Sequence, residues 1–170
     1  MKEAEEAGAR IRPEAYSEEY YLTSAEGHEE FAASAGRRLS PRLARALELA
    51  NPRLGERVLD IACGRGEVVL QSASRGAYAL GIDYAQAALG LARQSLSGAG
   101  PGLRAGLARM DATQAALRSE SFDLALMLDF VEHVYQPELE RAGGSSSTPP
   151  PTGCSRRWCT ATTCGTCTEG

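Results

Sequence analysis

The sequence predicts an α/β protein with a doubly wound, Rossmann-like parallel sheet and a helical N-terminal extension. Three observations carry this prediction: apolar strand-like runs alternate with helical patterns, the segments between the runs have crossover length, and small or acidic residues follow the runs. We expect the extension over residues 1–50, the sheet domain over 51–142 and a tail of different character over 143–170.

The N-terminal region reads as helical over residues 13–50. Pro13 suits the start of a helix, and Ser40-Pro41 places a capping hydroxyl before a proline at the first helical position. Leucines and alanines then repeat at helical spacing, and Asn51-Pro52 ends the pattern.

Four strands and three helical segments follow. The expected strands are residues 58–62, 77–82, 103–108 and 122–128. The expected helical segments are residues 66–74, 85–96 and 113–118, and Gly76 ends the first of them. The third strand is the weakest, because Arg104 and Gly106 are poor central-strand residues.

Composition and charge exclude several classes of protein. Hydrophobic residues make up 43% and charged residues 24% of the 170, which is typical of a globular domain with a core. The net charge of -4 offers no basic surface for a nucleic acid. No apolar run reaches membrane-spanning length, and residues 1–12 do not resemble a signal peptide. We therefore expect a cytoplasmic protein.

A loop of small residues follows the first strand. Gly64 and Gly66 lack Cβ atoms, so the backbone can approach a ligand, and the helix that begins at Gly66 directs free amides toward it. A tight strand-to-helix turn without a ligand explains the same residues equally well.

Acidic residues follow the other strands. Asp83, Asp111 and Asp129 lie at or just past strand ends, where ligands bind in open α/β sheets. Asp83 suits a ribose diol, but it also suits the cap of the next helix. Both roles are compatible only if each carboxylate oxygen serves one of them.

The dinucleotide fingerprint GxGxxG is absent. Its third glycine would permit close helix–strand packing, but Val69 stands at that position when the count starts from Gly64. A count from residue 62 also fails, because that residue is Ala62.

Four segments together resemble the successive motifs of class I S-adenosylmethionine-dependent methyltransferases of the small-molecule type. They read VLDIACGRGE, GIDYA, MDA and FDLALMLDFVEHV, and the resemblance covers about residues 55–140. The stretch YYLTSAEGHEEF is similar to the helical extension of small-molecule members. Ala62 departs from the pattern, since the family usually has glycine there.

The resemblance implies S-adenosylmethionine as the cofactor and residues 51–142 as a partial cofactor-binding domain. Residues 60–66 would surround the methionine part, Asp83 the ribose, Tyr84 and Asp111 the adenine, and Asp129 the methionine amino group and the methyl. The implied cofactor-binding residues are Asp60, Ala62, Cys63, Gly64, Gly66, Asp83, Tyr84, Asp111, Ala112 and Asp129.

The implied reaction is methyl transfer to a small-molecule acceptor, with no metal. Because the sulfonium already activates the methyl, the protein mainly aligns a nucleophile with it. Glu132 and His133 are candidates for a general base, although in the family this pair is generally not assigned that role. Tyr16, Tyr20 and Tyr21 are candidates to line the acceptor pocket, but tyrosines at this spacing more often pack a helix on the sheet.

Two other classes of function stay open. The chain is alternatively a non-catalytic methyltransferase-like fragment that binds only the cofactor or a protein partner. A nucleotide-sugar or NAD enzyme would use the same sheet edge.

The tail over residues 143–170 is crowded with Ser, Thr, Pro, Gly and Cys and has no hydrophobic periodicity. One interpretation is a zinc site formed by Cys154, Cys159, Cys164 and Cys167, and a second is disordered low-complexity sequence. The third, which we favour, is a frameshifted or truncated gene sequence after the fourth strand. Residues 122–128 would then be an unpaired apolar edge, so we expect this chain to be poorly stable or inactive as a monomer.

Overall fold

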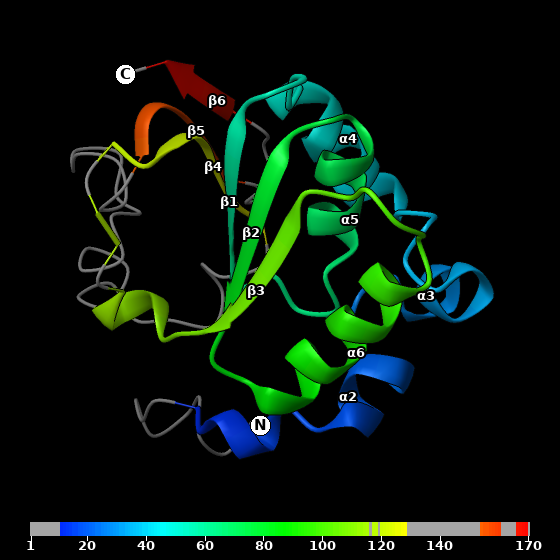
Figure 1. The fold of residues 1–170 in the computed structure, drawn as a ribbon. Coiled ribbons are helices and arrows are strands. Elements are labelled where there is room, and N and C mark those ends of the chain that lie inside the picture. Colours follow the sequence, from blue (N-terminus) through cyan, green and yellow to red (C-terminus); the bar gives the residue numbers. More distant parts are fainter. Residues whose placement is uncertain (1–10, 116, 119, 129–153, 161–165, 170) are drawn as a thin grey trace.

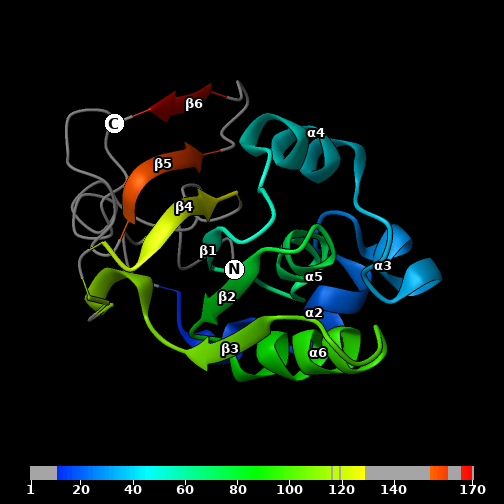
Figure 2. The ribbon, with the colours of Figure 1, turned by 45° about the horizontal axis from the view of Figure 1, so that its top comes forward.

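One six-stranded sheet organises the chain. The computed structural model describes residues 11–115, 117–118, 120–128, 154–160 and 166–169. The strands lie in the order β3-β2-β1-β4-β5-β6, as Figure 2 shows. They are β1 (Arg57–Ile61), β2 (Tyr78–Asp83), β3 (Ala105–Arg109), β4 (Phe122–Met127), β5 (Cys154–Thr160) and β6 (Thr166–Glu169). The first five run parallel and β6 runs antiparallel to β5, so the predicted α/β fold class is confirmed.

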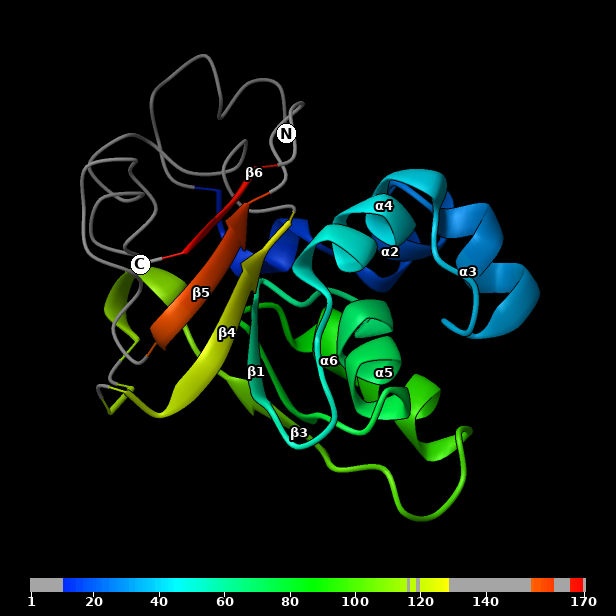
Figure 3. The same cartoon turned by 90° about the horizontal axis from the view of Figure 1, so that it is seen from above.

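Short and longer helices flank this sheet, and the three longest of those described lie on one face. The helices are η1 (Pro13–Ala15), α2 (Glu18–Thr23), α3 (His28–Ser34), α4 (Pro41–Ala50), α5 (Glu67–Ser74), α6 (Gln86–Ser97) and η2 (Ala112–Gln114). Figures 1 and 3 show α4, α5 and α6 on the same side of the strands. None of the described helices has the length and apolar character needed to cross a membrane.

Helix α4 begins and ends where the sequence indicates, whereas the helical region expected from residue 13 is broken into η1, α2 and α3. The Ser40 hydroxyl accepts a hydrogen bond from the Leu43 N–H at 3.3 Å, which caps α4. Asn51 ends α4 in the left-handed conformation with φ of 45°. The short helices α2 and α3 precede α4 and, together with η1, form the extension that packs on α6.

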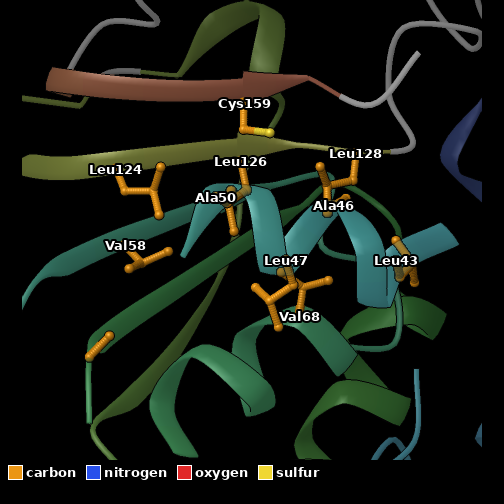
Figure 4. Packing of buried hydrophobic residues seen from close by; sticks show 11 residues of the cluster. Leu43, Ala46, Leu47, Ala50, Val58, Val68, Leu124, Leu126, Leu128 and Cys159 are labelled. Atoms are coloured by element: carbon orange, nitrogen blue, oxygen red, sulfur yellow. The ribbon is translucent and has the colours of Figure 1, made fainter. Parts of the chain in front are cut away.

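The main core lies between α4 and the strands. Figure 4 shows Leu47 and its neighbours on α4 packed against side chains from β1, β4 and β5. Because side chains alternate along a strand, the next residues face the other side of the sheet. There Leu59, Ile61 and Ile82 form a second apolar cluster, partly covered by the segment that includes η2.

Helix α5 approaches β2 closely at Gly81. A Cβ at this position would lie 2.7 Å from Cγ2 of Val69 and 2.8 Å from Sγ of Cys63, both of which are buried. Val69 stands where the dinucleotide fingerprint has its third glycine. The space that this valine needs is therefore provided from the opposite side, by a glycine on the strand.

The expectation that residues 122–128 form an unpaired edge is wrong. Strand β5 pairs with β4 in parallel, and β6 covers β5. The Arg157 guanidinium donates to both carboxylate oxygens of Glu56 at 2.6 and 2.7 Å and to the Ala50 carbonyl at 3.0 Å. Cys159 is 1% exposed within the main core. An apolar strand leaves a row of main-chain groups that need partners, and β5 supplies them.

The described parts of the tail therefore differ from the expectation of low-complexity sequence without regular structure. Its Thr, Trp and Cys residues suit strands that a neighbouring strand supports. Within the described residues, no three or more His, Cys, Asp or Glu side chains gather where they could hold a metal ion.

Candidate cofactor-binding site

The loop between β1 and α5 turns sharply through left-handed residues. Ala62, Gly64 and Gly66 have φ values of 57°, 52° and 78°. The family usually has glycine where Ala62 stands, and the conformation explains why: a residue with a Cβ pays roughly 1 kcal/mol there. At Gly66 a Cβ would also lie 2.8 Å from the Ala92 Cβ on α6. Both the left-handed backbone and this short contact therefore favour glycine at this position.

Asp83 joins this loop to the next helix. Its Oδ2 accepts from the Gly64 N–H at 2.9 Å, and its Oδ1 accepts from the Ala85 N–H, just before α6, at 2.8 Å. The residue is 4% exposed. Burial raises the pKa of this carboxyl, and the hydrogen bonds from the amides of Ala85 and Gly64 oppose the rise. The Tyr84 amide also donates to this carboxylate, and part of its acceptor capacity remains for a further donor.

The end of β3 supplies a second carboxylate at the same edge of the sheet. The Met110 N–H donates to the Asp83 carbonyl at 2.9 Å, which places the two chain segments side by side. Asp111 Oδ1 accepts from the Thr113 N–H and hydroxyl at 2.9 and 2.8 Å, and Oδ2 accepts from Gln114 at 3.2 Å. Asp111 therefore caps η2, which begins at Ala112, and its Oδ2 faces a more open environment.

An open pocket of about 510 Å³ lies beside these residues. The Tyr84 hydroxyl donates to the Ile11 carbonyl at 3.4 Å, and Arg109 donates to the Tyr84 carbonyl at 3.1 Å. A ring, a thioether and a carboxylate together suit a flat aromatic base that carries an amine. The lining residues are Ile11, Arg12, Pro13, Tyr84, Arg109, Met110 and Asp111.

Four tyrosines cluster where the extension meets the loop. The rings of Tyr16, Tyr20, Tyr21 and Tyr84 lie with centroids 5.3 to 6.4 Å apart. Tyr16 and Tyr21 are buried against α6. Burial raises the pKa of both phenols, and the nearby acidic and phenolic groups raise it further, so both stay neutral. These two tyrosines pack the extension, and Tyr20 is partly exposed.

Arg65, between the two loop glycines, was not anticipated. It is 4% exposed and donates to the carbonyls of Tyr21 at 2.6 Å and Glu26 at 2.7 Å. It also pairs with Glu67 at 2.8 Å. The sequence signal was present, because two charges flank Gly66 in an otherwise apolar strand–helix junction, but the partners lie about forty residues away and cannot be read from spacing.

The structure brings most of the expected site together. The loop residues, Asp83, Tyr84, Asp111 and Ala112 share the carboxyl edge of the parallel strands, beside η1 and α2 (Figure 1). Asp60 is buried within β1, and Cys63 packs against Gly81. The remaining candidates lie outside the described residues; they are Asp129, Glu132 and His133.

The fold defines the chain as a Rossmann-like α/β protein, with the candidate site at the carboxyl edge of its sheet. The chain belongs to the methyltransferase domain family, whose model matches residues 58–145, just over half of the chain.

The curated relatives are O-methyltransferases. The ubiquinone biosynthesis O-methyltransferase of Hahella chejuensis is 38% identical over 84 residues, which cover 49% of this chain and 34% of the relative. The enzyme of the same description from Sinorhizobium medicae is 40% identical over 83 residues, with 49% and 33% covered. The chain thus spans about a third of the length of these relatives.

Solved methyltransferase structures share the fold. Magnesium protoporphyrin IX methyltransferase from Synechocystis PCC 6803, with bound S-adenosylmethionine, has a TM-score of 0.59 at 17% identity, covering 93% of this chain and 80% of that one. A methyltransferase from Geobacter sulfurreducens in complex with S-adenosylhomocysteine has a TM-score of 0.54 at 20% identity, with 72% and 48% covered.

Proposed function

We propose that this chain binds S-adenosylmethionine at the carboxyl edge of its sheet and transfers the methyl group to a hydroxyl of a small molecule. The observation that carries the proposal is Asp83, whose two oxygens bind the amides of Gly64 and Ala85. The next residue, Tyr84, lines an open pocket. The names of the curated relatives support a hydroxyl as the acceptor.

The Asp83 carboxylate fits a ribose diol. The amide bonds hold both oxygens in place, and the remaining acceptor capacity of the carboxylate is available to the ribose. A buried anion gains more from such donors than an exposed one does, because water competes less. This arrangement supports a carboxylate that serves the main chain and a ribose together.

The pocket fits the adenine. The Tyr84 ring and the Met110 thioether offer apolar contact to a planar base, and Asp111 Oδ2 offers an acceptor to its exocyclic amine. We assign the ribose to Asp83, the adenine to this pocket and the methionine part to residues 60–66.

The reaction needs alignment more than acid–base chemistry. The cofactor supplies a methyl on a sulfonium, which is already a strong electrophile. The contribution of the chain is to hold the loop, exclude water and place the acceptor in line. Tyr20, which is partly exposed and whose ring lies 5.3 Å from that of Tyr21, is proposed to line the acceptor side. We propose Asp129 for the methionine amino group and either Glu132 or His133 as a base toward a hydroxyl.

Transfer of a labelled methyl group tests the proposal. The chain is incubated with methyl-labelled S-adenosylmethionine and separate sets of small molecules that bear hydroxyl, amine, thiol or carboxyl groups. We expect label in the hydroxyl set, and none when Asp83→Asn replaces the wild type. Binding of the cofactor without transfer to any set would contradict the proposed activity and leave a binding module.

A further inference from the structure

Arg65 links the loop to the N-terminal extension. Its guanidinium reaches the carbonyl of Tyr21 on α2 and the carbonyl of Glu26 after α2, at 2.6 and 2.7 Å. Its carbon Cζ also lies 4.8 Å from the centre of the Phe31 ring on α3, within cation–π range. One side chain therefore contacts three parts of the extension.

The surrounding residues are arranged for this contact. Glu67, on the first turn of α5, holds the guanidinium at 2.8 Å, and the two side chains are 8% and 4% exposed. Gly27 turns the chain over Arg65 with φ of 72°, and a Cβ there would lie 3.6 Å from Nη2 and 3.2 Å from the Ser40 Cβ. Loss of any of these partners would leave a buried polar group of the guanidinium without its hydrogen bond, which is costly.

The main chain of Arg65 belongs to the loop that the ligand would occupy. It lies between Gly64, whose N–H binds Asp83, and Gly66, where α5 is capped. A change in the loop would move the guanidinium away from the two carbonyls. A change in the extension would pull on the loop in the same way.

We propose that Arg65 is a positioning residue that couples the loop to the extension, so that occupation of the loop and closure of α2 and α3 over it occur together. The coupling is reciprocal by linkage: a ligand that fixes the loop also orders the extension, and loss of the guanidinium contacts weakens the ligand. The ligand half of this inference rests on the proposed function, whereas the contact between loop and extension does not.

Hydrogen exchange of the full chain, with and without S-adenosylhomocysteine, tests the coupling. Arg65→Lys keeps a positive charge beside Glu67 but lacks the planar group that reaches two carbonyls at once. We expect exchange over residues 18–34 to be about tenfold faster in this variant, the factor that corresponds to one lost charged hydrogen bond. Exchange over β1 and β2 should stay unchanged. The ligand should slow exchange over 18–34 in the wild type and not in the variant.

Two further variants complete the design. Arg65→Met combined with Glu67→Met removes the pair without leaving a buried charge and should behave like the lysine variant. Arg45→Met is the matched control, because Arg45 also pairs with a glutamate but is exposed on α4 and touches neither the loop nor the tyrosines. It should exchange like the wild type.

If residues 18–34 of Arg65→Lys exchanged hydrogen at the same rate as in the wild type, the inference would be overturned. Faster exchange over β1 and β2 as well would also overturn it, because Arg65 would then support the whole fold. If the wild type bound no S-adenosylhomocysteine, the proposed function would fail, and the ligand-free comparison would still decide whether Arg65 holds the extension.

Discussion

Asp83 shows how one residue can organise a site before any ligand binds. Its carboxylate fixes the loop on one side and the start of α6 on the other, both through main-chain amides. Replacing it removes an anchor for the loop and, in the proposed function, the acceptor for the ribose.

Asp83→Asn should weaken binding of S-adenosylhomocysteine by about a hundredfold, or ~3 kcal/mol, because the amide nitrogen cannot accept a bond from a main-chain N–H. Titration calorimetry measures this. Asp123→Asn is the control: that carboxylate pairs with Arg57 on β1, at the other end of the strands. Equal loss of affinity in both variants would contradict a specific role for Asp83.

A second single residue, Cys63, is expected to make the free energy of unfolding depend on pH. Burial raises the pKa of its thiol well above the usual range, with Asp60 and Asp83 adding to the rise. Above about pH 8.5 the unfolded chain loses this proton while the folded chain keeps it, so the free energy of unfolding should fall by up to ~1.4 kcal/mol per pH unit. Urea unfolding at pH 8 and at pH 10 should show this fall in the wild type and a smaller one in Cys63→Ala. An identical fall in both would contradict it.

At the scale of elements, much of the order could be predicted from the sequence. Helices α4, α5 and α6 and the first four strands lie within about two residues of their expected positions, because caps such as Ser40, Asn51 and Gly76 are local signals. The segment expected over 113–118 is shorter, since η2 ends at Gln114 and Ala115 is extended. The positions of β5 and β6 could not be predicted in this way. Their residues lack alternation, and the strands form because β4 offers a free edge, which is a property of the assembled sheet.

The close packing of α5 on β2 predicts that stability depends on the glycine at position 81. Gly81→Ala should destabilise the fold by about 1–3 kcal/mol, because its Cβ would press on Val69 and Cys63. Gly106→Ala on β3 is the matched control, since its Cβ would lie at an ordinary 3.5 Å from Leu80 Cδ1. Urea midpoints compare the two, and equal midpoints would contradict the packing argument. Adding Val69→Ala to Gly81→Ala should recover part of the loss.

For the whole molecule, the topology of the sheet explains where the candidate site lies. It does not explain the contacts that hold the N-terminal extension against that site. Acids and glycines at strand ends could be predicted to converge, because parallel strands all end at one edge. The contact of Arg65 with Tyr21 and Glu26 joins segments about forty residues apart and depends on how the extension packs. The expectation of low stability rested on an uncovered β4, and β5 removes that reason.

We propose that the carboxyl edge of this sheet binds S-adenosylmethionine and not a dinucleotide, since Val69 stands where the fingerprint has its third glycine. The most direct measurement is calorimetric titration of the full chain with S-adenosylhomocysteine and, separately, with NAD. We predict one site for S-adenosylhomocysteine with a dissociation constant in the micromolar range, or roughly -8 kcal/mol, and no heat from NAD. Binding of NAD, or binding of neither compound, would contradict the account.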